Sequence, residues 1–476
     1  MLFSSILFLF YFIPIFFALY YATRGSNVVL LLGSVVFYAW GELHYLWLLA
    51  LVTFITGIGG AAISRAHRRG RHGRVPLALA IGAELLLLGW FKYADFAASQ
   101  LAALRLGWPT PQAAHWALPL GISFYTFHAI SYLMDIHRRA VPRPARPVAL
   151  CVYIAMFPQL VAGPIVRYAT IAAQLEARRM SLTDIAAGIR LFVIGLAQKV
   201  LIANTLAVPV DQIFAQDPRS LGAGAAWLGT AGYTLQLYFD FGGYSLMAIG
   251  LGRMMGLTLP RNFDYPYVSR SITEFWRRWH ISLSSWFRDY VYIPLGGNQR
   301  GKRRTYVNLW SVFLLCGLWH GAAWTFVLWG VYHGAFLALE RAGMGRVIER
   351  MWRPLQHAYA LLTIVFGWVL FRADTPAHAW RFAGAMLGAG TMSTAPPAHD
   401  LTASVASAFV LAIAASVPWA RVVAPPAFAP PAFAVSATAL RSVMAASAFA
   451  ALAGLLVLSA AVLATGTYNP FIYFRF

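Results

Sequence analysis

The sequence predicts an all-α polytopic membrane protein with about eleven or twelve transmembrane helices. Of its 476 residues, 60% are hydrophobic and 11% are charged, whereas soluble domains carry about 25% charged residues. Apolar stretches near the ~20 residues needed to cross the hydrocarbon core recur along the whole chain. No alternating pattern of barrel strands is present, so each span must be helical to satisfy its backbone within lipid.

The candidate spans occupy residues 2–21, 27–48, 50–63, 76–91, 117–136, 185–203, 225–250, 306–320, 323–339, 355–371, 402–418 and 443–464. The first has no basic n-region and no small-residue cleavage site, so it is predicted to be a retained span and not a signal peptide. Cys151 and Cys316 both lie in apolar stretches, and no disulfide framework or zinc spacing can be built from them. We therefore expect one membrane-embedded domain over residues 1–476.

The positive charge is confined to short loops. A net charge of +21 could indicate a nucleic-acid partner, but the basic residues fall between the spans. They cluster at Arg65–Arg74, Arg138–Arg146, Arg167–Arg179, Arg300–Arg304 and Arg341–Arg353. Loops enriched in Lys and Arg stay in the cytoplasm, and they attract anionic lipid headgroups. The pattern predicts a bilayer as partner and no nucleic acid.

Residues 148–166 form the one apolar stretch between the second and third basic loops. They are broken by Pro158, Gly163 and Pro164, and an internal proline removes a helical hydrogen bond and clashes with the preceding turn. We expect a re-entrant segment over residues 150–165, with both flanks in the cytoplasm. Irregular backbone at membrane depth requires cover by protein or by a water-filled cavity, so this segment predicts a cavity.

Residues 264–297 predict an amphipathic helix in the membrane interface. Ser271 and Glu274 have the spacing of a capping box, and Glu274 with Arg278 forms an i,i+4 ion pair. Apolar side chains then recur every three or four residues, at Trp276, Trp279, His280, Leu283, Phe287 and Tyr290. Such a helix is usually only an anchor. The imidazole of His280 on the apolar face favours a further role.

Ionisable residues inside apolar stretches are costly in lipid and indicate function. His320 lies in LLCGLWHGAAW without a neighbouring countercharge, and a histidine can act as a general base near neutral pH. Cys316 precedes it by four residues and would share its helical face, which permits a Cys–His acyl-enzyme, although a free cysteine is more often packing. Glu84, Lys199 and Asp240 are also embedded, and ion pairs between helices explain them as well as function does.

Other classes of site are not expected. His320 and His333 are thirteen residues apart and no HExxH sequence occurs, so a metal site is not predicted. His128 and His333 are left unassigned, with structural roles favoured. No P-loop or dinucleotide fingerprint is present, so nucleotide hydrolysis is not predicted either.

Several blocks of the sequence resemble a known family. They are YPYVSRSITEFWRRWHISLSSWFRDYVYIPLGGN, LWHGAAWTFVLWGVYHG, FYTFHAISYLMDIHRR, MFPQLVAGPIVRY, YFDFGGYSLMAIGLGRMMG and the closing NPFIYFRF. Together they resemble the bacterial branch of the membrane-bound O-acyltransferase (MBOAT) family, with the nearest likeness to alginate O-acetyltransferases. The core motifs cover residues 119–335. Where that family has FSGYSDMAIG, this chain has Gly242 and Leu246, while Asp240 is retained.

The resemblance implies an acyltransferase in the bacterial inner membrane. His320 would be the catalytic base, and His280 a second catalytic histidine that orients acceptor or donor. It further implies acetyl-CoA as the acyl donor with no permanently bound cofactor, a polysaccharide acceptor, and periplasmic or membrane partner proteins. The residues that bind the donor stay unassigned. The alternatives are a transporter or flippase for lipid-linked sugars, a non-catalytic scaffold, and a D-alanyl transferase for teichoic acid.

Overall fold

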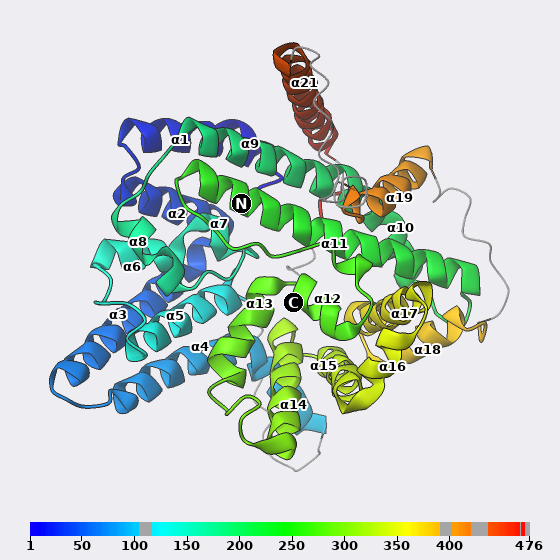
Figure 1. Cartoon of the computed structure of the whole chain (residues 1–476), viewed down its shortest axis with the longest axis horizontal. Helices are drawn as coiled ribbons and strands as arrows, with labels where there is room; N and C mark the ends of the chain where they lie inside the picture. Colours follow the sequence, from blue (N-terminus) through cyan, green and yellow to red (C-terminus); the bar gives the residue numbers. More distant parts are fainter. Residues whose placement is uncertain (104–116, 391–401, 420–436, 467, 472–476) are drawn as a thin grey trace.

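The computed structural model describes residues 1–103, 117–390, 402–419, 437–466 and 468–471 (Figure 1). Within these residues the regular structure is entirely helical, without β-strands. The last five residues of the closing NPFIYFRF string lie outside the described residues. The all-α prediction is confirmed.

The first half of the chain contains η1 (Phe8–Phe12), α1 (Ile13–Ala22), α2 (Asn27–Glu42), η2 (Leu43–Tyr45), α3 (Leu46–Arg68), α4 (Arg74–Ala103), α5 (Ile122–His137), α6 (Pro147–Ala155), α7 (Phe157–Leu160), α8 (Tyr168–Glu176), α9 (Leu182–Ala197), η3 (Gln198–Ala203), α10 (Asn204–Phe214) and α11 (Ala223–Met254). The second half contains η4 (Pro266–Val268), α12 (Ile272–Arg278), α13 (Ile281–Phe287), η5 (Arg288–Tyr292), α14 (Gly301–His320), α15 (Trp324–Leu339), η6 (Glu340–Met344), α16 (Gly345–Arg350), α17 (Arg353–Arg372), α18 (Pro376–Met386), α19 (Ala403–Ala415) and α21 (Ala437–Ala464).

The long helix α11 organises the molecule. It runs beside α9 across the upper part of the view, and the short helices α12 and α13 lie below it near the centre (Figure 1). The α14–α15 hairpin and α17 flank α12, and α3, α4 and α5 form a layer on the other side. Helix α21 projects away from the rest. The central position of α12 and α13 shows that the Trp-rich segment is packed among other helices.

Five helical segments in the described part of the chain are long and apolar enough to cross a membrane. They are Asn27–Arg68, Arg74–Ala103, Leu182–Phe214, Arg353–Arg372 and Ala446–Ala464. The shorter helices Phe8–Ala22 and Ala403–Ala415 are also apolar. These segments agree with a polytopic membrane protein, and the total of eleven or twelve spans stays a prediction.

The segment predicted to re-enter the membrane is broken where its sequence indicates. Helix α6 ends at Ala155, Met156 leaves the helical conformation, and α7 lasts only four residues. The two flanks come together, because Arg143 before the segment forms an ion pair of 3.0 Å with Glu176 after it. The backbone therefore brings the two flanks together, and their common location in the cytoplasm stays a prediction.

The embedded charges connect helices. Lys199 and Asp240 form a buried ion pair of 2.7 Å between η3 and α11. Glu84 accepts a hydrogen bond of 2.9 Å from the hydroxyl of Thr56, which joins α4 to α3. Each contact gives its charged group a structural partner, which favours the interpretation that these charges lock helices together.

Candidate active site

The α14–α15 hairpin positions His320 at its closed end. Helix α14 ends at His320 because Gly321 adopts an extended backbone with φ −174°. The two helices approach closely at Gly317 and Gly330, where an added Cβ would lie 2.4 Å from a carbonyl oxygen of the opposite helix. Glycine is therefore required at this crossing. This close crossing brings the end of α14 against α15, one helical turn before His320.

His320 is buried among aromatic rings. Its side chain is only 5% exposed, and its ring centroid lies 4.9 Å from that of Trp319, 5.0 Å from that of Trp329 and 5.1 Å from that of Phe371. The Nδ1 atom is buried without a hydrogen-bond partner among the described residues. The Nδ1 atom is therefore not engaged by any hydrogen bond to a described residue.

Two cavities meet at His320. The first, here the His320 cavity, has a volume of ≈ 100 Å³ and is lined by Lys92, Leu118, Pro119, Leu120, Gly121, Ile122, Ser123, Phe124, Val161, Ala162, Trp319 and His320. The second, here the aromatic cavity, has a volume of ≈ 10 Å³ and is lined by Leu237, Phe241, Trp279, His320, Trp329, Trp368 and Phe371. The predicted re-entrant segment contributes Val161 and Ala162 to the first. It therefore lines a cavity, as its broken backbone predicted.

Lys92 is the site residue that the sequence analysis missed. Its ammonium donates a hydrogen bond of 2.5 Å to the carbonyl oxygen of Trp319 and one of 3.2 Å to the hydroxyl of Ser123. It thus lies beside the residue that precedes His320, and both Lys92 and His320 line the His320 cavity. The sequence did contain a sign that Lys92 lies inside a helix and not at its end. Helix-forming residues continue for eleven positions beyond it, to the end of α4 at Ala103.

The single helix predicted within residues 264–297, beginning at the Ser271 capping box, is wrong as one element. It divides into α12, α13 and η5, with His280 between the first two in the left-handed region at φ 43°. The cause is Asn262, whose side-chain oxygen lies 3.1 Å from Nδ1 of His280 and whose carbonyl oxygen accepts a hydrogen bond of 2.9 Å from Ile281 N–H. These contacts replace the helical hydrogen bonds at that point.

His280 lies close to His320 without lining either cavity. Its ring is fully buried, and its centroid is 6.0 Å from that of Trp319, which also packs against His320. The Nε2 atom is buried and has no partner among the described residues. The structure therefore gathers both predicted histidines around one tryptophan, with only His320 open to the cavities.

Other features of the Trp-rich segment agree with prediction. The Ser271 hydroxyl accepts a hydrogen bond of 3.1 Å from Glu274 N–H, and Glu274 forms an ion pair of 2.8 Å with Arg278. Burial raises the pKa of Glu274, but the backbone N–H of Arg270 and the Arg278 guanidinium outweigh it and hold the pKa below its usual range. The six predicted stripe residues are all buried.

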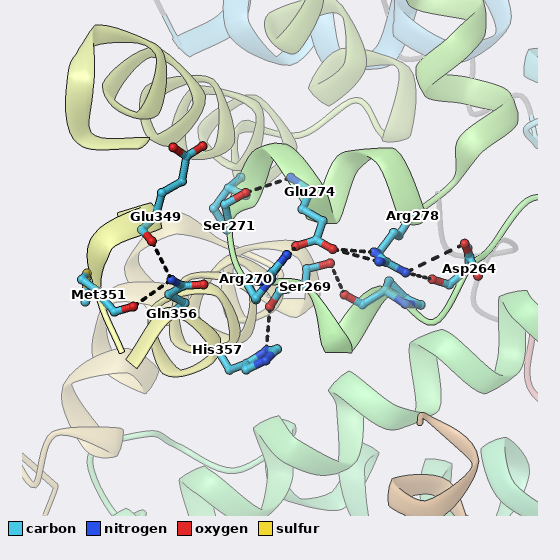
Figure 2. Close-up of polar contacts among 12 residues, drawn as sticks. Asp264, Ser269, Arg270, Ser271, Glu274, Arg278, Glu349, Met351, Gln356 and His357 are labelled. Carbon is cyan, nitrogen blue, oxygen red and sulfur yellow. Dashed lines mark hydrogen bonds and ion pairs between the residues drawn. The ribbon is translucent and has the colours of Figure 1, made fainter. Parts of the chain in front are cut away.

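A larger cavity of ≈ 860 Å³, here the arginine cavity, is lined by residues of α12 and its neighbours. Figure 2 shows how Glu274 in this lining contacts Arg270 and Arg278. Its lining carries four arginines and four carboxylates, namely Arg270, Arg277, Arg278, Arg341, Asp264, Glu274, Glu340 and Glu349. Glu274 contacts Arg270 and Arg278, and Glu340 accepts hydrogen bonds from Ile272 N–H and Thr273 N–H. The exposed side chains of Arg277 and Arg341 have no ion-pair partner in the described part of the chain.

The remaining candidates lie away from these openings. Cys316 is buried, and it is absent from the described residues that line the two cavities at His320. The described residues contain no group of three or more His, Cys, Asp or Glu side chains that could hold a metal ion. His333 is enclosed by Trp276 and Trp329 at centroid distances of 5.3 and 5.0 Å. That enclosure agrees with a structural role.

Comparison with known proteins identifies the family. Residues 85–374, which contain Lys92, His280 and His320, match the model of the membrane-bound O-acyltransferase family. The chain belongs to the MBOAT family. It is therefore an O-acyltransferase, and its helices are those of a polytopic membrane enzyme.

Three relatives with curated names are similar to this chain in sequence. The chain is 46% identical over 396 residues to "Probable alginate O-acetylase AlgI" of Pseudomonas aeruginosa, covering 82% of this chain and 76% of the relative. It is 35% identical over 431 residues to "Peptidoglycan O-acetyltransferase" of Helicobacter pylori, covering 83% and 81%. It is 29% identical over 286 residues to "Teichoic acid D-alanyltransferase" of Bacillus subtilis, covering 54% and 69%.

Proposed function

We propose that this MBOAT enzyme transfers an acetyl group from acetyl-CoA to hydroxyl groups of an exported polysaccharide such as alginate, directly or through a partner protein. The observation that carries the proposal is His320, a buried imidazole without a hydrogen-bonded carboxylate among the described residues, at the wall of a small cavity. An imidazole there can take the proton of an attacking hydroxyl. The greater identity to an alginate O-acetylase than to a D-alanyltransferase favours acetyl over D-alanyl transfer.

The size of the His320 cavity supports a short acyl group. Its volume of ≈ 100 Å³ is enough for a few groups the size of a water molecule. A short acyl group such as acetyl fits in a space of this size. Trp319 and Phe124 contribute aromatic rings to its wall.

The arginine cavity supports a donor that carries phosphate groups. Arg277 and Arg341 are unpaired in the described part of the chain, whereas the lining carboxylates Asp264 and Glu274 already pair with arginines and Glu340 accepts backbone N–H hydrogen bonds. Guanidinium groups bind phosphate in a bidentate manner. By the distribution of basic residues this cavity faces the cytoplasm, where acetyl-CoA is available. We propose the bacterial inner membrane as the location for the same reason.

Transfer of labelled acetyl groups tests the proposal. The protein is reconstituted in vesicles and supplied with acetyl-CoA labelled in the acetyl group, with alginate and membrane extract as sources of acceptor and partner. We expect label in the polymer, and we expect Arg277→Gln with Arg341→Gln to raise KM for acetyl-CoA with little change in kcat. Label transfer from a D-alanyl thioester but not from acetyl-CoA would refute the assignment.

A further inference from the structure

Lys92 is a charged group that the roles assigned above do not use. It lies in α4, within a segment apolar enough to span a membrane, and it is partly buried. No carboxylate pairs with it in the described part of the chain. An ionisable residue within a membrane helix is costly and indicates function, and here the cost is not offset by an ion pair.

The ammonium is held at a fixed place beside His320. An ammonium group has three N–H donors. One donates to the carbonyl oxygen of Trp319 at 2.5 Å and a second to the hydroxyl of Ser123 at 3.2 Å. The third has no acceptor among the described residues, and both Lys92 and His320 line the same cavity. Because Trp319 and His320 are consecutive, the anchor that positions the ammonium also fixes it relative to the imidazole.

We propose that Lys92 is a catalytic residue that stabilises the oxyanion formed on the carbonyl of the acyl donor. This rests on the proposed function, since it needs a thioester carbonyl in the His320 cavity. The hydroxyl oxygen of the acceptor attacks the carbonyl carbon, and a C–O bond forms as the hydroxyl proton passes to His320. The carbonyl electron pair moves onto oxygen, where the third N–H of Lys92 binds it.

The intermediate then collapses to products. The C=O bond reforms, the C–S bond breaks, and the thiolate leaves with its electron pair. The imidazolium of His320 returns the proton to that thiolate, so an ester and a thiol are produced and both side chains regain their starting states. Electrostatic stabilisation by a fixed donor that faces the developing charge is usually the largest single contribution to such catalysis.

A purely structural role for Lys92 is the alternative to a catalytic one. The same contact with Trp319 also joins α4 to the end of α14, and Lys92 could serve only as that connection. Tyr93 provides a matched control, because its hydroxyl donates a hydrogen bond of 2.7 Å to the carbonyl oxygen of Leu318 and so joins the same two helices. Tyr93 carries no charge and does not line the His320 cavity.

The test compares Lys92→Met with Tyr93→Phe in the labelled transfer assay, with kcat and KM measured separately. We expect Lys92→Met to lower kcat about 10²–10³-fold, the range found when one oxyanion donor is removed, with a small change in KM. We expect Tyr93→Phe to stay close to wild type. Similar losses in the two variants, or a near-normal kcat in Lys92→Met, would overturn the proposal in favour of a structural connection.

A chemical rescue excludes a folding defect as the cause. Lys92→Cys is made in a background where Cys151 and Cys316 are replaced by alanine, and it is treated with 2-bromoethylamine, which converts the cysteine into a lysine analogue. We expect treatment to restore most of the activity, and Lys92→Ser given the same treatment to stay inactive. No recovery after complete modification would refute the catalytic role. If the wild-type protein transfers no acetyl group at all, the proposed function is refuted. The role of Lys92 is then tested by comparing the same variants with whichever acyl thioester the wild type does use.

Discussion

Replacing Lys199 with methionine tests whether the embedded charges lock the helices together. Its ammonium lies 2.7 Å from a carboxylate oxygen of Asp240, and the two side chains are 1% and 2% exposed. It also donates a hydrogen bond of 2.7 Å to the side chain of Asn204 and another to the carbonyl oxygen of Pro470. Removal of one partner from a buried pair leaves an uncompensated charge, so we expect Lys199→Met to lower the free energy of unfolding by about 3–5 kcal/mol.

An exposed ion pair is the control for this measurement. Arg143 and Glu176 also pair at 3.0 Å, but their side chains are 59% and 44% exposed, so Arg143→Gln should cost about 0–1 kcal/mol. Both variants are unfolded in mixed micelles with increasing SDS, followed by tryptophan fluorescence. We expect Lys199→Met with Asp240→Leu to regain most of the lost stability. Equal, small losses in Lys199→Met and Arg143→Gln would refute the reasoning, and loss of activity without loss of stability would assign Lys199 to the chemistry.

Three further outcomes follow from the geometry. Cysteines placed at Pro144 and Gln174 in a cysteine-free background should react with an impermeant reagent from the same side, and labelling from opposite sides would exclude the re-entrant segment. His280→Asn, which tolerates the left-handed backbone, should remain folded by size-exclusion chromatography but transfer acetyl poorly; normal rates would reduce His280 to a structural residue. The pKa of Glu274 lies below its usual range, so its contribution to stability is present above the unfolded pKa of about 4.3 and is lost as pH falls through the folded value. Glu274→Gln should therefore flatten the acid limb of stability measured by thermal unfolding, and an unchanged limb would contradict this.

The features that were predicted from sequence depend on neighbouring residues. The capping box needs only Ser271 and Glu274, three residues apart, and the interruption of residues 148–166 needs only its prolines and glycine. Burial of the six stripe residues was also predicted from their spacing, although the helix expected to carry them is divided at His280. Hydrogen bonds within one turn decide such features, so no knowledge of the rest of the fold is required.

The features that were missed depend on contacts distant in sequence. The left-handed turn at His280 results from hydrogen bonds to Asn262, eighteen residues earlier, and a helical pattern gives no sign of it. Lys92 was overlooked because the apolar stretch at residues 76–91 stops just before it, although α4 continues to Ala103. Its partner Trp319 is 227 positions away. Only the assembled fold shows that this lysine lies beside His320.

The measurement that tests the account most directly is kcat for acetyl transfer by His320→Gln, with Cys316→Ala as the matched variant from the same helix. Loss of a general base typically lowers the rate about 10²–10⁴-fold, so we predict a fall of that size at normal protein level for His320→Gln. Cys316→Ala should keep most of its activity, because Cys316 does not line the cavities at His320 in the described structure. A near-wild-type rate in His320→Gln would contradict the assignment of the base, and loss of activity in both variants would replace direct transfer with an acyl-cysteine intermediate.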